Sequence, residues 1–241
     1  RVLFRSEKFK VEVDEKEILV RAELPGNNCG GCGFPGCDGL AAAIAAGTAP
    51  VNGCPVGGAP VADKIAAIMG VESGSSEKKV AFVKCKGTCD KTNVKYNYYG
   101  ITDCSMVTVA PGSGEKACAY GCMGYGSCVK ACQFDAIHVV DGVAVVDKEK
   151  CVACGKCVAT CPKGLIELVP YKAEHLVQCS SHDKGPAVKK VCTAGCIGCT
   201  LCTKQCEFDA IHMENNVAVI DYEKCTNCGK CAAKCPAKVI Q

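Results

Sequence analysis

Cysteines at a fixed spacing are the residues of this chain that could carry chemistry. The run from Cys225 to Pro236 reads CTNCGKCAAKCP, with cysteines at Cys225, Cys228, Cys231 and Cys235. Three thiolates at this spacing hold one [4Fe–4S] cluster, and the fourth reaches a second cluster. The run recurs at 151–162 and, without its proline, at 196–206. The spacing predicts an iron–sulfur electron carrier.

The composition agrees with metal binding rather than with an ordinary hydrophobic core. The 241 residues include 25 cysteines and no tryptophan, and aromatic residues make up only 5%. Such a cysteine content also occurs in disulfide scaffolds, but an odd count arranged in triplets argues against them. Because metal binding energy is also folding energy, we expect the apoprotein to be largely unfolded. A net charge of +3 without an aromatic–basic stripe makes nucleic acid an unexpected partner.

A different cysteine pattern lies near the N-terminus. Cys29, Cys32 and Cys37 form C-x2-C-x4-C, and Cys54 follows in NGCPVGG. Glycines among them let the backbone approach a bulky inorganic group. We expect three helices, over 14–24, 38–46 and 61–69. Asp14 and Asp38 are the expected caps of the first two. The pattern predicts a small helical domain with one [4Fe–4S] cluster, and a structural zinc site is the alternative.

An internal repeat occupies the second half of the chain. Residues 118–167 align without a gap on residues 192–241. Each copy has two short strands around a tight turn, Asp141-Gly142 or Asn215-Asn216, and then a cysteine triplet and a short helix. We therefore predict an α+β fold, in which a small helical [4Fe–4S] domain precedes tandem ferredoxin-like two-cluster modules. The predicted divisions are 1–70, a linker and possible extra cluster region at 71–117, 118–170, and 171–241.

The repeated runs resemble those of bacterial two-cluster ferredoxins, in which each triplet binds its cluster with the fourth cysteine of the other run. For the second module this rule implies one cluster on Cys196, Cys199, Cys202 and Cys235, and another on Cys225, Cys228, Cys231 and Cys206. For the first module it implies a cluster on Cys151, Cys154, Cys157 and Cys132. The remaining cluster departs from the rule, because Tyr125 aligns with Cys199. We expect Cys118 to replace the missing ligand beside Cys122, Cys128 and Cys161; a three-iron cluster is the alternative.

Five cysteines stay outside these sets. They are Cys85, Cys89, Cys104, Cys179 and Cys192. We expect Cys85, Cys89 and Cys104 to hold a sixth cluster, with Cys179 or Cys192 as the fourth ligand. The alternatives are reduced structural cysteines or a zinc site. The chain is thus expected to bind six [4Fe–4S] clusters, and at least five.

Three other features carry no chemistry on this interpretation. His138 and His212 fall at equivalent strand positions and are expected at the surface. Gly31, Gly33 and Gly36 match G-x-G-x-x-G, but no strand precedes them and cysteines interrupt them, so a dinucleotide site is not expected.

The order of the motifs resembles that of the B subunits of Rnf complexes. LPGNNCGGCGFPGCDGLA is followed by APVNGCPVGG, KCKGTC and GCMGYGSCVKACQFDAIHV, and then by the paired cysteine runs. Rnf complexes are membrane redox pumps that couple reduced ferredoxin and NAD⁺ to Na⁺ or H⁺ translocation. The resemblance implies an electron-transfer subunit at the cytoplasmic face of the cell membrane. Its implied partners are ferredoxin as electron donor and the other Rnf subunits.

Family members carry an N-terminal membrane helix, which is expected upstream of Arg1. NAD⁺ reduction and the ion step are expected of other subunits. Lysines between Lys78 and Lys95 and at Lys189-Lys190 could dock an acidic ferredoxin or form an ordinary surface. The rival interpretations are a polyferredoxin subunit of another oxidoreductase, such as a hydrogenase, and a structural zinc protein.

Overall fold

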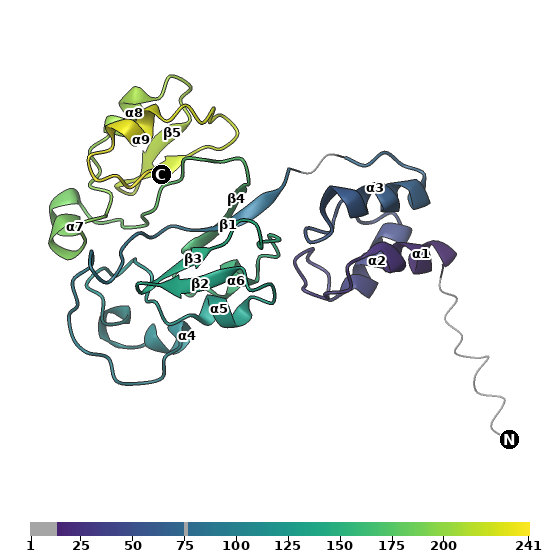
Figure 1. Ribbon diagram of the computed structural model, residues 1–241, viewed down its shortest axis with the longest axis horizontal. Helices are drawn as coiled ribbons and strands as arrows, with labels where there is room; N and C mark the ends of the chain where they lie inside the picture. Colours follow the sequence, from purple (N-terminus) through teal and green to yellow (C-terminus); the bar gives the residue numbers. More distant parts are fainter. Residues whose placement is uncertain (1–13, 75–76) are drawn as a thin grey trace. The chain divides into compact units, whose positions relative to one another are not determined.

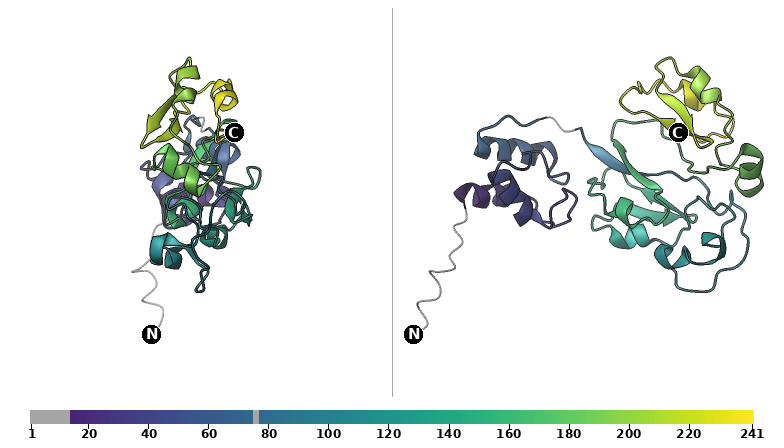
Figure 2. Two further views of the ribbon diagram at one scale, coloured as in Figure 1. Left: turned by 90° about the vertical axis from the view of Figure 1, so that its left-hand side faces the viewer. Right: turned by 180° about the vertical axis from the view of Figure 1, so that it is seen from behind.

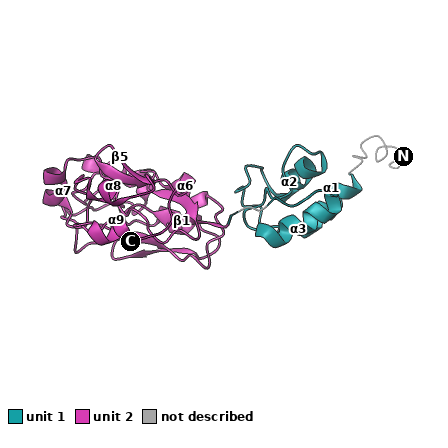
Figure 3. Cartoon of the chain, turned by 90° about the horizontal axis from the view of Figure 1, so that it is seen from above, with its two compact units in different colours: residues 1–77 teal, residues 78–241 magenta. Residues whose placement is uncertain are grey.

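The computed structural model describes residues 14–74 and 77–241. The expectation about the start of the chain at Arg1, and residues 75–76 of the predicted linker, lie outside the described residues. The chain divides into two compact units, residues 1–77 (unit 1) and 78–241 (unit 2) (Figure 3).

Unit 1 is made of three helices. They are α1 (Glu15–Glu23), α2 (Cys37–Ala45) and α3 (Gly58–Met69), and α1 packs against both others (Figure 1). Asp14 caps α1 as the sequence predicts, since its carboxylate accepts a hydrogen bond from the Lys16 N–H at 2.9 Å. The core between the helices consists of buried aliphatic side chains, among them Val20, Leu40, Ile44 and Ile65.

The predicted cap of the second helix is wrong. The helix begins one residue earlier than expected, at Cys37, and its N-cap is Gly36. Asp38 lies in the first turn, where its carboxylate pairs with the Arg21 guanidinium of α1. An acidic side chain in the first turn also favours the helix, because the N-terminal end of a helix dipole is positive.

Unit 2 consists of short elements joined by long loops. Its strands are β1 (Lys79–Val83), β2 (Ile137–Val140), β3 (Val143–Val146), β4 (Ile166–Pro170), β5 (Ile211–Glu214) and β6 (Val217–Ile220). Its helices are α4 (Cys104–Val107), the 3₁₀ helix η2 (Pro111–Ser113), α5 (Ser127–Ala131), α6 (Lys156–Thr160), α7 (Gly185–Val191), α8 (Leu201–Gln205) and α9 (Lys230–Lys234). The predicted α+β class, with short helices and small hairpins, is confirmed.

The two hairpins form where the repeat predicts them. β2 pairs with β3 and β5 with β6, both antiparallel. Each turn has two central residues with positive φ, 48° and 75° at Asp141-Gly142 and 46° and 66° at Asn215-Asn216. Asn, Asp and Gly adopt this conformation readily, which explains why these residues close the hairpins.

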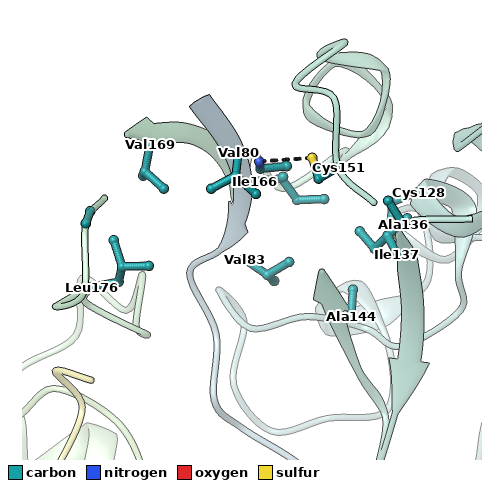
Figure 4. Close-up of a cluster of buried hydrophobic side chains, with 12 residues drawn as sticks. Val80, Val83, Cys128, Ala136, Ile137, Ala144, Cys151, Ile166, Val169 and Leu176 are labelled. Atoms are coloured by element: carbon teal, nitrogen blue, oxygen red, sulfur yellow. Dashed lines mark hydrogen bonds between the residues drawn. The ribbon is translucent and has the colours of Figure 1, made fainter. Parts of the chain in front are cut away.

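A third antiparallel pair, β1 with β4, was not predicted as a pair from the sequence. Val80 and Val83 of β1 and Ile166 and Val169 of β4 are buried in one hydrophobic cluster with Ile137 of β2 (Figure 4). The two repeats lie at opposite ends of unit 2, with β1 and β4 between them (Figures 1 and 2). The second repeat has its own cluster, and Tyr222 packs against both.

The described residues contain no helix with the length and apolar character needed to cross a membrane.

Candidate metal centres

Twenty of the cysteines line five hollows in unit 2, four around each. Site 1 is lined by Cys132, Cys151, Cys154 and Cys157; site 2 by Cys104, Cys122, Cys128 and Cys161; site 3 by Cys85, Cys118, Cys179 and Cys192; site 4 by Cys196, Cys199, Cys202 and Cys235; and site 5 by Cys206, Cys225, Cys228 and Cys231. Five hollows, each with the same set of four cysteines, indicate one kind of occupant.

Short helices carry cysteines to two sites at once. Cys128 in α5 lines site 2, and Cys132, directly after this helix, lines site 1. In the same way Cys157 of α6 lines site 1, and Cys161 at its end lines site 2. The arrangement repeats in α8 and α9, which connect sites 4 and 5. The packed pairs α5–α6 and α8–α9 therefore hold the two hollows of each repeat side by side.

Loop residues with positive φ bend the chain around the hollows. In the triplet loop of site 1 these are Ala153 (φ 54°) and Gly155 (φ 75°), and in that of site 5 Asn227 (φ 55°) and Gly229 (φ 72°). The equal positions and similar angles show that both triplets form the same loop. Glycine and asparagine tolerate this conformation at little steric cost, so three cysteines can converge within a few residues.

Backbone N–H groups point at several of the cysteine sulfurs. Ala81 in β1 donates to Cys151 Sγ at 3.4 Å (Figure 4). Leu165 donates to Cys161 Sγ, and the equivalent Val239 donates to Cys235 Sγ, each at 3.4 Å. Such bonds orient a thiolate and stabilise its negative charge, and hydrogen bonds to the sulfurs also influence the potential of a bound cluster.

Burial works in the opposite direction on the free thiols. It raises the pKa of Cys128 to about 12, and those of Cys157, Cys179 and Cys202 to about 11. The cause is that a hollow away from water disfavours the thiolate. These four cysteines belong to four different sites, so in each of those hollows burial disfavours the free thiolate, and a bound cation would offset this cost.

Site 3 draws its cysteines from outside the regular runs. A Cβ on Gly87 would lie 3.5 Å from Cys192 Sγ and 3.7 Å from Cys85 Sγ. A Cβ on Gly121 would lie 3.4 Å from Cys118 Sγ and 3.6 Å from Cys85 Sγ. The two glycines thus allow the backbone to lie close to the sulfurs on both sides of this hollow.

The cysteines that line the hollows differ from the sequence-based grouping at Cys104, Cys118, Cys89 and one of the pair Cys179 and Cys192. Cys104, and not Cys118, completes site 2. It reaches this hollow from α4 in the segment 95–117, and it packs with Tyr125, the residue that aligns with Cys199. Cys118 instead lines site 3, with both Cys179 and Cys192 rather than one of them. Cys89 lines none of the five hollows; it is exposed, with its Sγ against Gly142 of the hairpin turn.

The repeat contains a signal that would have predicted this grouping. Cys118 and Cys192 are equivalent positions, and both line site 3. Cys85 and Cys179 also correspond, because Val83 pairs with Ile166 and Val177 with its equivalent Ile240. The pairings Val83–Ile166 and Val177–Ile240 exist only in the folded chain. The sequence alone therefore does not reveal that Cys85 and Cys179 correspond.

Contacts between neighbouring sites place them in a row. Sites 1 and 2 share α5 and α6, and sites 4 and 5 share α8 and α9. The Cys122 N–H of site 2 donates to Cys85 Sγ of site 3 at 3.3 Å. The Cys196 N–H of site 4 donates to Cys179 Sγ of site 3, also at 3.3 Å. The order along unit 2 is thus site 1 to site 5, with site 3 between the repeats.

Several lysines and a histidine line the hollows, a role that the sequence did not predict for them. The lysines are Lys84, Lys86 and Lys116 at site 3, Lys163 at site 2 and Lys156 at site 1. Burial lowers the pKa of Lys163, an effect that the nearby Cys118, Cys122 and Cys85 oppose. His175 lines site 5, and its Nδ1 is buried without a hydrogen-bond partner. His138 and His212 have half-exposed side chains near acidic residues, as expected of surface positions.

Unit 1 contains a sixth group of four cysteines. Cys37, the first residue of α2, and Cys54 are buried in the core of this unit, and Cys32 packs against it. Cys29 and Cys37 both contribute to the raised pKa of Cys54, after burial, which is the main cause. The Asn28 side chain accepts a hydrogen bond from the Cys37 N–H at 2.8 Å and closes the loop between Cys29 and α2.

The donor chemistry suits iron–sulfur clusters. Thiolates are the ligands of [4Fe–4S] clusters, four for each, and a four-thiolate set surrounds every hollow. Within residues 14–74 and 77–241, no three His, Cys, Asp or Glu side chains are close enough together to hold a single metal ion. The cysteines instead face one another across a hollow, which fits a polynuclear group.

Three parts of the chain match known iron–sulfur families. Residues 24–56 match a family described as a putative Fe-S cluster, residues 144–167 a 4Fe-4S binding domain, and residues 195–240 a 4Fe-4S dicluster domain. The region 24–56 contains the four cysteines of the group in unit 1, and the region 195–240 contains the eight cysteines of sites 4 and 5. Site 3 has no cysteine inside a matched region.

Relatives match the chain over nearly its whole length. The B subunit of the Na⁺-translocating ferredoxin:NAD⁺ oxidoreductase complex of Acetobacterium woodii is 52% identical over 96% of this chain and 70% of the relative. The B subunit of an ion-translocating oxidoreductase complex of Methanosarcina acetivorans is 45% identical over 100% and 91%. The B subunit of the proton-translocating complex of Clostridium ljungdahlii is 42% identical over 98% and 84%. The chain therefore belongs to the family of B subunits of ion-translocating ferredoxin:NAD⁺ oxidoreductase (Rnf) complexes, as an iron–sulfur electron-transfer subunit.

Proposed function

We propose that this chain accepts electrons from reduced ferredoxin and relays them toward NAD⁺ reduction, coupled to Na⁺ or H⁺ translocation by its complex. The observation that carries this proposal is the unbroken row of five four-cysteine hollows in unit 2. Neighbouring hollows share helices or are joined by an N–H···S hydrogen bond, as a relay requires. The NAD⁺ chemistry and the ion step belong to other subunits of the complex.

The residues that would hold the cofactors are the four cysteines of each group. Sites 1 to 5 would hold one [4Fe–4S] cluster each, and Cys29, Cys32, Cys37 and Cys54 a sixth. Such a cluster supplies a one-electron carrier whose potential depends on hydrogen bonds to sulfur, net charge and solvent exposure. Cys89 would ligate none. Residues 1–70 would form the N-terminal cluster domain, 118–170 and 171–241 the two modules, and 71–117 would donate Cys85 and Cys104.

The protein itself would control access and charge around the sulfurs. Buried cysteines such as Cys128 and Cys202 keep water from the hollows. Backbone N–H groups, for example those of Ala81 and Leu165, donate to the sulfurs. Burial and hydrogen bonds to sulfur are the contacts by which the protein would set the potential of each bound cluster.

Ferredoxin and the other Rnf subunits would be the partners, at the cytoplasmic face of the cell membrane. The family supports association with a membrane complex, since the relatives are subunits of ion-translocating complexes. Lys78 to Lys95 and Lys189-Lys190 would help an acidic ferredoxin to dock. Charge complementarity of this kind raises the association rate more than the affinity, and salt weakens it.

The test is a metal analysis of the anaerobically purified chain, followed by reduction with ferredoxin. About twenty-four irons with equal sulfide would support six clusters, because each cluster has four irons. About twenty would remove one cluster and keep the function. Zinc in place of iron would contradict electron transfer. Reduced ferredoxin should bleach the visible cluster absorbance, and an intact cluster spectrum that ferredoxin leaves unchanged would overturn the assignment of the donor.

A further inference from the structure

Site 3 is built from two equivalent halves. Cys118 and Cys192 open the two repeats, and Cys85 and Cys179 lie at corresponding positions in the segments before them. The contacts are equivalent as well: Cys122 N–H donates to Cys85 Sγ and Cys196 N–H to Cys179 Sγ, both at 3.3 Å. Judged by the cysteines alone, the route for an electron from site 3 to site 2 is therefore equivalent to the route from site 3 to site 4.

Lysines at equivalent positions of the two repeats break this equivalence. Lys163 lines site 2, directly after Pro162, whereas Ala237 occupies the equivalent position in site 4. Lys116 is buried, with 8% of its surface exposed, and lines site 3, whereas the equivalent Lys190 is exposed to solvent. Lys84 and Lys86 also line site 3, but Lys84 pairs with Glu167 and the half-buried Lys86 donates to the Lys238 oxygen at 3.3 Å. Lys163 and Lys116 thus have no counterparts at the equivalent positions of the second repeat.

Backbone carbonyl groups hold both ammonium groups in place. Lys163 Nζ donates to the Gly121 oxygen at 3.1 Å, and Gly121 lies against Cys118 and Cys85 of site 3. Lys116 Nζ donates to the Gly87 oxygen at 3.0 Å and to the Gly142 oxygen at 2.6 Å. A carbonyl group solvates an ammonium group but leaves its positive charge in place. The two charges therefore remain beside sites 2 and 3.

We propose that Lys163 and Lys116 raise the reduction potentials of clusters held at sites 2 and 3 above that of the cluster held at site 4. This inference rests on the proposed function. Reduction adds one negative charge, which a nearby cation stabilises, and partial burial strengthens the attraction. Each transfer moves one electron: the donor site is oxidised, the acceptor site is reduced, and no bond or proton changes. Electrons that enter the second repeat are thereby drawn toward the first.

The experiment is a redox titration of the full cluster-loaded chain, followed by electron paramagnetic resonance. Lys163→Ala copies the alanine of the second repeat and should shift at least one component to a more negative midpoint potential. We expect at least a tenfold change in the one-electron equilibrium, which is about 59 mV. Lys163→Arg keeps the charge and should restore most of the midpoint. The reciprocal Ala237→Lys should shift one component, that of site 4, to a less negative potential.

Lys116→Met and Lys190→Met form a matched pair for the second cation. The first should lower a midpoint and the second should leave all midpoints unchanged, because Lys190 is solvated. Iron content of each variant controls for cluster loss; if Lys163→Ala loses iron, Ala237→Lys decides the question. Unchanged midpoints in loaded variants would overturn the inference and leave the relay intact. A wild-type chain without clusters would overturn the proposed function itself.

Discussion

Cys122 donates its backbone N–H to Cys85 Sγ at 3.3 Å, although the two residues are 37 positions apart and line different hollows. The contact joins a cysteine of the first ferredoxin-like run to one from the unpredicted strand pair. It makes site 3 the immediate neighbour of site 2. The same contact between Cys196 and Cys179 continues the row to site 4.

The double variant Cys104→Ser/Cys122→Ser separates the two possible groupings. If both cysteines belong to site 2, the double variant should lose about four irons, no more than each single variant. If Cys104 instead served a cluster with Cys85 and Cys89, as the sequence-based grouping expected, the double variant would lose about eight. Iron and sulfide per chain, measured on anaerobic protein, give the answer. Serine is the replacement because it keeps the size of the side chain while weakening the ligand.

Cys89→Ser should retain its full iron content. Its thiol is exposed and lines none of the five hollows. Metal analysis and the visible spectrum should match those of the parent chain. A loss of about four irons would show that Cys89 is a ligand, as the sequence-based grouping expected.

Removal of iron by a chelator under anaerobic conditions should unfold unit 2 cooperatively. Its elements are only three to seven residues long, and each repeat packs its small aliphatic cluster around cysteine-lined hollows. Without a cluster, the free energy of metal binding no longer supports the fold. Far-ultraviolet circular dichroism before and after chelation is the measurement, and retained signal with a cooperative thermal transition would contradict the expectation.

Gly124→Ala should destabilise the cluster-loaded protein more than Gly155→Ala. Both glycines have positive φ, 83° and 75°, so both substitutions introduce backbone strain of about 1–2 kcal/mol. An added Cβ at Gly124 would also lie 2.6 Å from the Gly142 oxygen, while nothing lies within 4 Å at Gly155. The midpoint of thermal unfolding should fall by roughly 2–4 °C per kcal/mol. Equal shifts for the two variants would show that the close contact relaxes without strain.

The sequence was sufficient for the family, the α+β class and the two hairpins. Motifs carry these features locally: a triplet at fixed spacing encloses one hollow, and Asp141-Gly142 or Asn215-Asn216 closes one hairpin. The same local logic led to one wrong detail, the cap at Asp38. That side chain pairs with Arg21 from another helix, and no pattern around Asp38 predicts the pair.

The four cysteines that line each of the hollows of sites 1, 4 and 5 are the ones that the sequence groups together, because helices five residues long fix the relation between a triplet and the distant fourth cysteine. Only the tertiary structure decided sites 2 and 3. Cys104 reaches its hollow through a long loop, and site 3 depends on how the two repeats meet around β1 and β4. Lys116 is buried beside Cys85, where the Gly87 and Gly142 oxygens accept its hydrogen bonds, while Lys190 remains in solvent. Such contacts depend on packing between distant segments, for which local spacing holds no information.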